Sequence, residues 1–208
     1  MKVLITAGPT RERIDAVRFI SNRSTGKMGY ALAEAAADAG HEVTLISGPT
    51  ALDSHTKAKL VQVESAAEMA DAVHLYAPEA DAIIMTAAVA DYRPVEVNAG
   101  KLKKTDGQMV LHLERTEDIL AGLGKIRRTE QIVVGFAAET DNVEVYAKDK
   151  LQRKKLDYIV ANDISKNDRG FGSDSNAVTV FGADGSCHVL PLASKKTIAQ
   201  KLLKLIFS

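Results

Sequence analysis

Short runs of apolar residues alternate along the chain with longer segments in which apolar residues recur every three or four positions. Continuous apolar runs such as AIIMTA and IVVGFA are typical of strands buried on both faces of a parallel sheet. The alternation of such runs with helical patterns predicts a Rossmann-like, doubly wound α/β fold with a mostly parallel sheet. The predicted strands cover residues 3–7, 43–47, 60–63, 82–86, 132–137 and 158–161, and the predicted helices cover 26–39, 66–77, 118–127, 142–155 and 194–207.

Two segments depart from this alternation. Residues 177–192, AVTVFGADGSCHVLPL, predict a C-terminal antiparallel hairpin around a glycine-containing turn. About thirty residues separate the strand at 82–86 from the helix at 118–127, and a connection of this length usually forms a lid, a binding loop or a dimerisation arm. We expect an extended arm over residues 91–114, with its alternating end, MVLHLE, as a strand outside the main sheet.

The connection between the first strand and the first helix is also long. It takes about twenty residues, where a strand-to-helix loop usually needs about 2–6, so the excess predicts a binding site. A helix start that contains glycine presents backbone N–H groups and a positive dipole end, which together bind phosphate. The candidate phosphate or substrate residues of this loop are Gly8, Thr10, Ser24, Thr25, Gly26 and Lys27.

Three of the predicted loops leave the carboxyl ends of strands and therefore meet at one edge of the sheet. They bring together Asn22, Asp91 and Lys101 with the lysines of the helix at 142–155. Such a group of cations, a carboxylate and amides suits a polyphosphate with a metal ion. The candidate glycines and lysines also have structural explanations. Glycines permit close packing of a helix on a strand, and most lysines of amphipathic helices face water.

Composition limits the function classes. The 208 residues fit one domain spanning 1–208, and 27 basic against 27 acidic side chains give no electrostatic case for nucleic acid or membrane as a partner. The only cysteine, Cys187, excludes an internal disulfide and a cysteine-based zinc site, and the five histidines show no metal-binding spacing. Met1 leads directly into the first strand without a signal peptide, and no apolar stretch could span a bilayer, so we expect a cytoplasmic protein.

Common nucleotide-binding motifs are missing. A P-loop would need Gly at Ser21 and Ser or Thr at Met28, and the pattern G-x-G-x-x-G is absent. The segment TGKMGYALAEAAADAGHEVTLIS and the pair Tyr146 and Lys150 imitate a short-chain dehydrogenase, but the serine expected about a dozen residues before the tyrosine falls in a predicted buried strand. A nicotinamide-dependent oxidoreductase of that type and a non-catalytic nucleotide-binding module are the alternatives.

The segments GPTRERID, VRFISNRSTGKMG, MTAAVADYRP, KLKK, VVGFAAET and IVANDIS, in this order, resemble bacterial phosphopantothenate–cysteine ligase over nearly the whole chain. The resemblance implies a ligase of coenzyme A biosynthesis. The carboxylate of 4'-phosphopantothenate would attack CTP, releasing pyrophosphate and leaving an acyl-cytidylate. The amine of L-cysteine would then displace CMP to give 4'-phosphopantothenoyl-L-cysteine. Because Met1 precedes the first strand directly, the chain resembles the stand-alone form of this enzyme.

The resemblance also assigns residues. Asn22 matches the catalytic asparagine that acts on the acyl-cytidylate, and Lys101 matches the lysine linked to formation of that intermediate. No side chain is assigned to the metal, because Mg²⁺ would arrive with the CTP phosphates. The implied partners include a second copy of the chain and a separate phosphopantothenoylcysteine decarboxylase, and ATP is the alternative nucleotide. The nucleotide-binding positions are Met85, Thr86, Ala87, Asp91, Lys101, Glu117, Asp118, Ile119, Leu120, Phe136, Lys150 and Lys154.

The chain departs from the family pattern at three places. Thr116 and Glu117 stand where Asn-Pro is expected, Ala16 replaces a proline, and Thr25 replaces a serine. The Thr25 change keeps a hydroxyl. A carboxylate at Glu117 would repel a triphosphate, so we expect its side chain to point away from the ligand.

Overall fold

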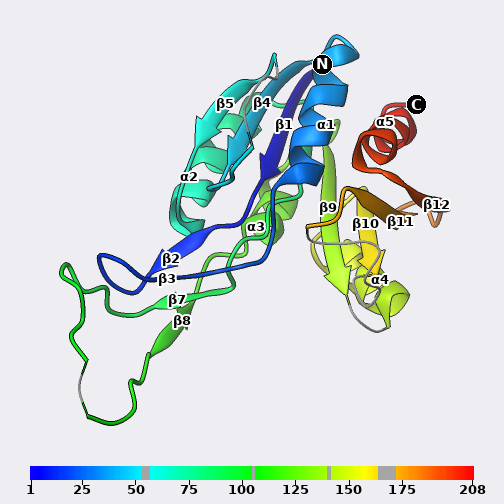
Figure 1. Ribbon diagram of the computed structural model, residues 1–208. Helices are drawn as coiled ribbons and strands as arrows, with labels where there is room; N and C mark the ends of the chain where they lie inside the picture. Colours follow the sequence, from blue (N-terminus) through cyan, green and yellow to red (C-terminus); the bar gives the residue numbers. More distant parts are fainter. Residues whose placement is uncertain (53–56, 105, 140–141, 164–171) are drawn as a thin grey trace.

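The computed structural model describes residues 1–52, 57–104, 106–139, 142–163 and 172–208. Its main sheet has eight strands in the order β12-β11-β10-β9-β6-β1-β4-β5 (Figure 1). Six neighbouring strands are parallel and the two at one edge are antiparallel, which confirms the predicted fold class. The parallel strands are β1 (Lys2–Ala7), β4 (Glu42–Ser47), β5 (Lys59–Gln62), β6 (Ala82–Met85), β9 (Ile132–Glu139) and β10 (Tyr158–Asp163), and the antiparallel ones are β11 (Ser175–Gly182) and β12 (Cys187–Ser194).

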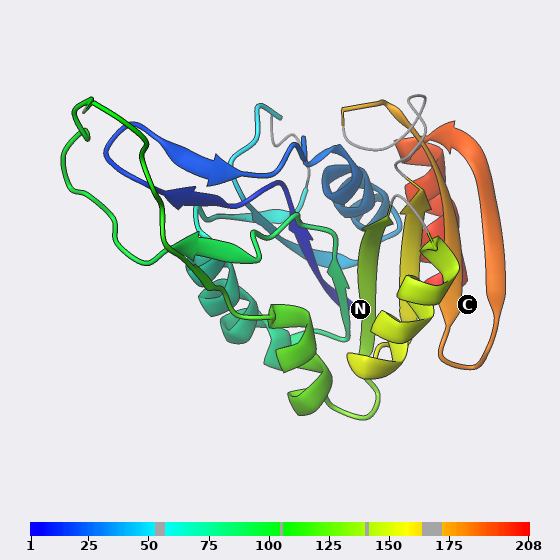
Figure 2. The same ribbon diagram turned by 90° about the horizontal axis from the view of Figure 1, so that it is seen from below.

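Helices cover both faces of this sheet (Figure 2). One face carries α1 (Lys27–Asp38) and α5 (Lys195–Ile206), and the other carries α2 (Ala66–Tyr76), α3 (Ile119–Ile126) and α4 (Val143–Arg153), with a short 3₁₀ helix η1 (Ala77–Glu79) after α2. Consecutive strand residues point to opposite faces. Ile5 and Ile84 therefore pack beneath α1 and α5, whereas their neighbours Leu4 and Ile83 pack against α2 and α3. The sheet is therefore apolar on both faces, as the unbroken apolar runs in the sequence indicate.

The strand order places a crevice at the carboxyl end of the sheet. From β1 the chain builds outward through β4 and β5 on one side, then crosses back and builds through β6, β9 and β10 on the other. Loops that leave β1 and β6 therefore diverge to opposite sides, and ligands of doubly wound folds bind at this switch point.

Two small ladders lie outside the main sheet. The long loop after β1 contains a hairpin of β2 (Arg11–Arg13) and β3 (Phe19–Ser21), which the sequence analysis treated only as a loop. In the arm, β7 (Tyr92–Pro94) pairs with β8 (Leu113–Arg115). The predicted strand over 109–114 is wrong in its extent, because only its last two residues belong to β8. Met109 and Val110 are exposed and face no packed surface.

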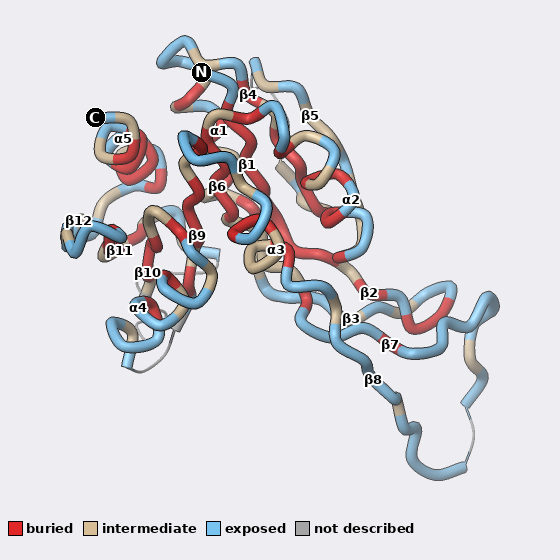
Figure 3. The backbone as a smooth tube through the Cα atoms, turned by 180° about the vertical axis from the view of Figure 1, so that it is seen from behind, coloured by how far each residue is buried: buried red, intermediate tan, exposed pale blue. Residues whose placement is uncertain are grey.

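The arm projects from the sheet and the β2–β3 hairpin runs beside it (Figures 1 and 3). Most of both segments is exposed, apart from a buried stretch near the turn of the hairpin (Figure 3). The C-terminal hairpin is confirmed, with strands slightly longer than the predicted range.

Candidate functional site

The loops after β1 and β6 are joined to each other beyond the end of the sheet. Pro9 and Ala88 form a parallel bridge, and Ala88 N–H donates to Gly8 O at 2.9 Å. The Thr10 hydroxyl accepts a hydrogen bond from Ala90 N–H at 2.9 Å, and Thr10 is fully buried. Gly8 and Thr10 were expected to contact a ligand, but neither lines the cavity described below. They build the support beneath the site.

Asn22 lies at this junction. Its Nδ2 donates to Ala88 O at 2.9 Å, although the two residues come from different loops. The bond holds an exposed carboxamide over the switch point between β1 and β6. Asn22 also lines the cavity described below.

The start of α1 is shaped for close approach. Gly26 has a φ of 78°, a backbone conformation that residues with side chains rarely adopt. A Cβ on Gly29 would lie 2.5 Å from Ala7 Cβ and 2.6 Å from Thr86 Oγ1, so only glycine lets α1 pack this closely on β1 and β6. The first turn carries no acidic residue, and its N–H groups face the cavity region with the positive end of the helix dipole.

A cavity of about 430 Å³ runs along this edge of the sheet, from α3 and α4 on one face to α1 and α5 on the other. This volume suits a small-molecule site. The structure brings most of the predicted residues into it. They are Asn22, Ser24, Thr25, Gly26, Lys27, Met85, Thr86, Ala87, Asp91, Glu117, Asp118, Ile119, Leu120, Phe136, Lys150 and Lys154.

The end near α3 and α4 holds two lysines and a capping aspartate. Asp118 Oδ1 accepts from Ala121 N–H at 3.0 Å, which caps α3, and from Lys154 Nζ at 2.9 Å. Burial raises the pKa of Asp118, but the hydrogen bonds from Lys154 and Ala121 outweigh that effect, and the pKa lies below its usual value. Lys154 is thereby held at the cavity wall with its side chain 15% exposed, alongside Lys150.

Glu117 is held by a contact with another helix. Its Oε1 lies 2.8 Å from His74 Nε2 on α2. This contact draws the carboxylate toward α2, as expected for a residue beside an anionic ligand. A ligand contact at position 117 would then rely on the backbone.

Lys101 is the predicted site residue that the structure separates most clearly from the others. It is exposed on the arm and does not line the cavity of its own chain. Conversely, Asn162, Asn176 and Lys195 line the cavity and were not assigned from the sequence. Lys195 follows the Ser of a predicted helix start, a pattern that indicates a cap and gives no sign that the lysine is buried.

The arm near Lys101 is fixed by one buried carboxylate. Asp15 accepts hydrogen bonds from Val17 N–H and Arg18 N–H, each at 2.9 Å, and from Leu102 N–H at 3.1 Å, and it is 2% exposed. The hydrogen bond from the Arg18 guanidinium holds the pKa of the Asp15 carboxyl well below its usual range, against the opposing effect of burial. Asp15 therefore ties the hairpin turn to the residue next to Lys101.

Replacing this carboxylate should loosen the arm. In Asp15→Asn one oxygen becomes a donor and the charge that attracts Arg18 is lost, so we expect faster hydrogen exchange at the Leu102, Val17 and Arg18 amides with unchanged protection of β1. Because the folded pKa is depressed, the wild-type contact persists from neutral pH down through the ordinary carboxyl range and is lost only in stronger acid. Asp106→Asn, an exposed change on the same arm, is the control. Unchanged exchange at Leu102 would contradict this role for Asp15.

The described ranges contain no group of three His, Cys, Asp or Glu side chains able to hold a metal ion. Two of the carboxylates that line the cavity already have partners, because Glu117 contacts His74 and Asp118 contacts Lys154 and the Ala121 amide. Within the same ranges, no helix is long and apolar enough to cross a membrane.

Comparison with known proteins shows the family to which the chain belongs. The family model described as "DNA/pantothenate metabolism flavoprotein C-terminal domain" matches residues 1–208. The coenzyme A biosynthesis bifunctional protein CoaBC of Bacillus subtilis (strain 168) is 54% identical over 203 residues, which make up 97% of this chain and 50% of that protein. The chain thus spans about half the length of the curated relatives it matches.

Solved structures agree. A crystal structure of the C-terminal domain of a CoaBC protein has a TM-score of 0.84 and 49% identity, covering 99% of this chain and 93% of that one. A mutant of the protein Cab2, described as a complex with phosphopantothenate-cysteine, has a TM-score of 0.82 over 99% of this chain and 85% of that one. Its identity is 18%, so this likeness concerns the fold alone.

Proposed function

We propose that this chain, which belongs to the DNA/pantothenate metabolism flavoprotein C-terminal domain family, is a CTP-dependent phosphopantothenate–cysteine ligase. The observation that carries the proposal is the cavity at the β1/β6 switch point. It joins a fixed carboxamide, the uncapped start of α1 and lysines on both faces of the sheet. Cab2, which has the same fold, is described in complex with phosphopantothenate-cysteine, the product of the proposed reaction.

The proposed reaction joins two anions before it forms an amide. The 4'-phosphopantothenate carboxylate attacks the α-phosphorus of CTP, the bond to the pyrophosphate oxygen breaks, and the acyl-cytidylate remains. Lys150, Lys154 and the amides at the start of α1 reduce the repulsion between the reactants. The cysteine amine then adds to the acyl carbon, and CMP leaves as the amide forms. In this proposal the Asn22 amide, held by its bond to Ala88 O, uses its other N–H to donate to the oxygen that gains charge in this step.

Magnesium is part of this proposal. Mg²⁺ would enter on the nucleotide phosphates, which the lysines and backbone amides of the cavity can bind, because this ion usually keeps substrate phosphates and waters among its ligands. When bound, the ion would neutralise phosphate charge.

The decisive experiment mixes the protein with CTP, Mg²⁺, 4'-phosphopantothenate and L-cysteine and follows pyrophosphate and CMP. We expect equal release of both, dependent on phosphopantothenate. A nucleotide-binding module would bind CTP with no release, and an oxidoreductase would change nicotinamide absorbance. Turnover with CTP and with ATP at equal concentration tests the choice of nucleotide. Faster turnover with ATP would contradict it.

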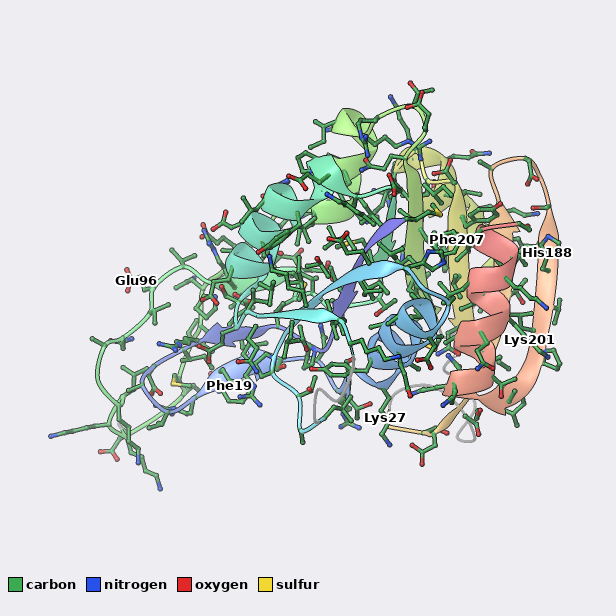
Figure 4. All side chains as sticks on the ribbon, turned by 90° about the horizontal axis from the view of Figure 1, so that it is seen from above. Phe19, Lys27, Glu96, His188, Lys201 and Phe207 are labelled. Atoms are coloured by element: carbon green, nitrogen blue, oxygen red, sulfur yellow. The ribbon has the colours of Figure 1, made fainter. Side chains whose placement is uncertain are left out.

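We also propose that the chain forms a homodimer through the arm and the β2–β3 hairpin. Phe19 on the hairpin is 46% exposed, and Val95, Val97 and Val110 on the arm are 54%, 57% and 70% exposed. These side chains lie on the projecting segments, and Figure 4 shows Phe19 and Glu96 far from the edge that carries His188. Apolar exposure concentrated on one projection is typical of a protein interface. In such a dimer a partner's arm would bring its Lys101 to a cavity that this lysine does not line in its own chain.

Light scattering after size-exclusion chromatography tests this assembly. We expect about twice the 22.3 kDa chain mass at micromolar concentration. Charges introduced in Val95→Glu with Val97→Glu should give a folded monomer, because they would be buried in the interface. Val189→Glu, on the exposed edge strand β12, is the control and should stay dimeric. A wild-type monomer would overturn the assembly.

The wider setting is also a proposal. The relatives are named as bifunctional proteins of coenzyme A biosynthesis. We propose a cytoplasmic location and a phosphopantothenoylcysteine decarboxylase as the consumer of the product.

A further inference from the structure

The cavity continues past the start of α1 to polar residues that the proposed reaction has not used. Asn162 on β10, Asn176 on β11 and Lys195 on α5 line this end. Lys195 is 7% exposed and Asn176 is 3% exposed. Polar side chains are rarely buried this deeply without a reason, and a lysine least of all.

Lys195 is kept at this position by the backbone. It is the first residue of α5, and its N–H donates to Asp174 O at 2.9 Å. Burial lowers the pKa of Lys195, and the nearby charge of Lys27 lowers it further, while Asp174 acts in the opposite direction. An anion at this end of the cavity would therefore stabilise the ammonium.

Lys27 approaches the same region from α1. Its Nζ lies 2.5 Å from Asp174 Oδ1 and 3.4 Å from Gly172 O. Figure 4 shows Lys27 at the start of its helix, next to the segment that leads into β11. The Asp174 side chain is 88% exposed, so this carboxylate sits on the solvent side of the pair. Lys27, Lys195 and the two asparagines line the cavity, whereas Asp174 is not among its lining residues.

Asn162 has an incomplete set of contacts. Its Oδ1 is buried and has no hydrogen-bond partner among the residues that the structure describes. A buried polar atom of this kind is usually satisfied by water or a ligand. Rotation of the carboxamide would present its NH₂ group to an acceptor in the cavity instead.

The Lys195 end of the cavity lies beside the predicted nucleotide-binding residues, and this position indicates which ligand would reach it. Asn162 is next to Ala138 in the register of β9 and β10, and Phe136 pairs with Val160 two residues earlier. The Lys195 end thus adjoins the predicted nucleotide positions on β9 and the start of α1. Asn22 lies on the other side, over the β1/β6 junction. If the α-phosphate of a nucleotide lies between the lysines of α4 and the start of α1, as the proposed reaction requires, its β- and γ-phosphates would extend past α1 toward Lys195.

We propose that Lys195, with Lys27, binds the terminal phosphates of the nucleoside triphosphate and the pyrophosphate that leaves. This inference rests on the proposed function for the identity of the nucleotide. A second source of the same chemistry is the 4'-phosphate of phosphopantothenate, and the test separates the two.

The test compares Lys195→Met with Lys196→Met. The first keeps the bulk of a buried side chain without its charge. The second changes the next residue of α5, whose Nζ is 3.6 Å from Glu34 and whose side chain is 62% exposed. Binding of CTP, CMP, inorganic pyrophosphate and 4'-phosphopantothenate is measured by calorimetry with Mg²⁺ present, and thermal unfolding is followed for each variant.

Lys195→Met should weaken CTP and pyrophosphate about 10- to 100-fold, the effect of one charge-assisted hydrogen bond. CMP has no terminal phosphates and should bind as in the wild type, as should 4'-phosphopantothenate. Lys196→Met should resemble the wild type throughout.

Other results would overturn the inference in distinguishable ways. An equal loss for CMP and CTP would show general damage to the site, and a loss confined to 4'-phosphopantothenate would assign this end to the other phosphate. Unchanged binding of all four ligands would remove Lys195 from the site. If the wild type bound neither CTP nor CMP, the proposed function would fail, while the pyrophosphate titration would still decide whether Lys195 binds phosphate.

Discussion

Asn22→Asp should release pyrophosphate from CTP and then accumulate the acyl-cytidylate. The wild-type amide donates from Nδ2 to Ala88 O at 2.9 Å, which fixes it over the crevice. A carboxylate has no such donor, and it would face both this carbonyl oxygen and an anionic intermediate. Loss of one preorganised donor and addition of a negative charge should raise the second barrier by on the order of 3 kcal/mol or more.

Mass spectrometry of quenched mixtures detects the accumulated intermediate directly. The expected pattern is a burst of pyrophosphate, little CMP and little final amide. Gln200→Glu, the same carboxamide-to-carboxylate change at an exposed position on α5, should behave as the wild type. Normal turnover by Asn22→Asp would show that the carboxamide is dispensable. Loss of the pyrophosphate burst would move its role to the first step.

The main sheet was predictable because its signal is repeated and long. Each central strand must be apolar on both faces, and this produces unbroken runs such as AIIM in β6. Helix starts were predictable for a similar local reason. Asp118 and Ser194, where two predicted helices begin, are the N-caps of α3 and α5, and their side chains accept from amides three residues later. Both features are encoded within a few neighbouring residues.

The small ladders were not predictable on these grounds. β2, β3, β7 and β8 have three residues each, too few for an alternating pattern to stand out. Contacts with residues distant in sequence also position them, as in the bond from Ala66 N–H to the buried Glu12 carboxylate on β2. A buried acidic residue in a polar segment looks like any solvent-exposed one until the fold supplies its partners.

The same limit applies to the site. Sequence placed the nucleotide residues at one edge because strand ends must meet there. It did not find Lys195, since the burial of that lysine depends on how α5 packs beside α1 across a separation of well over a hundred residues. It also grouped Lys101 with the others, although the arm carries this residue away from the cavity of its own chain. Loops that leave neighbouring strands start close together, but this does not determine where the far end of a long arm lies.

Lys101→Gln should suppress the first half-reaction, with on the order of 100-fold slower pyrophosphate release and little acyl-cytidylate formed. The lost cation is the one expected to stabilise charge on the α-phosphate and the leaving pyrophosphate. Lys103→Gln, an exposed change two residues away, is the matched control and should keep most activity. Build-up of intermediate at the wild-type rate in Lys101→Gln would contradict the assignment.

The two variants together test where Lys101 acts. If it completes the partner's cavity, a heterodimer of Lys101→Gln with Asn22→Asp has one site with both wild-type residues and one with neither. Co-refolding equal amounts makes half of the dimers mixed, so the mixture should recover about one quarter of wild-type activity although each parent is nearly inactive. If Lys101 instead acts in its own chain, every site of the mixed dimer carries one of the two substitutions, and no activity is recovered. A mixture no more active than its parents would therefore place the arm over its own cavity, after a movement of Lys101 from the exposed position seen here.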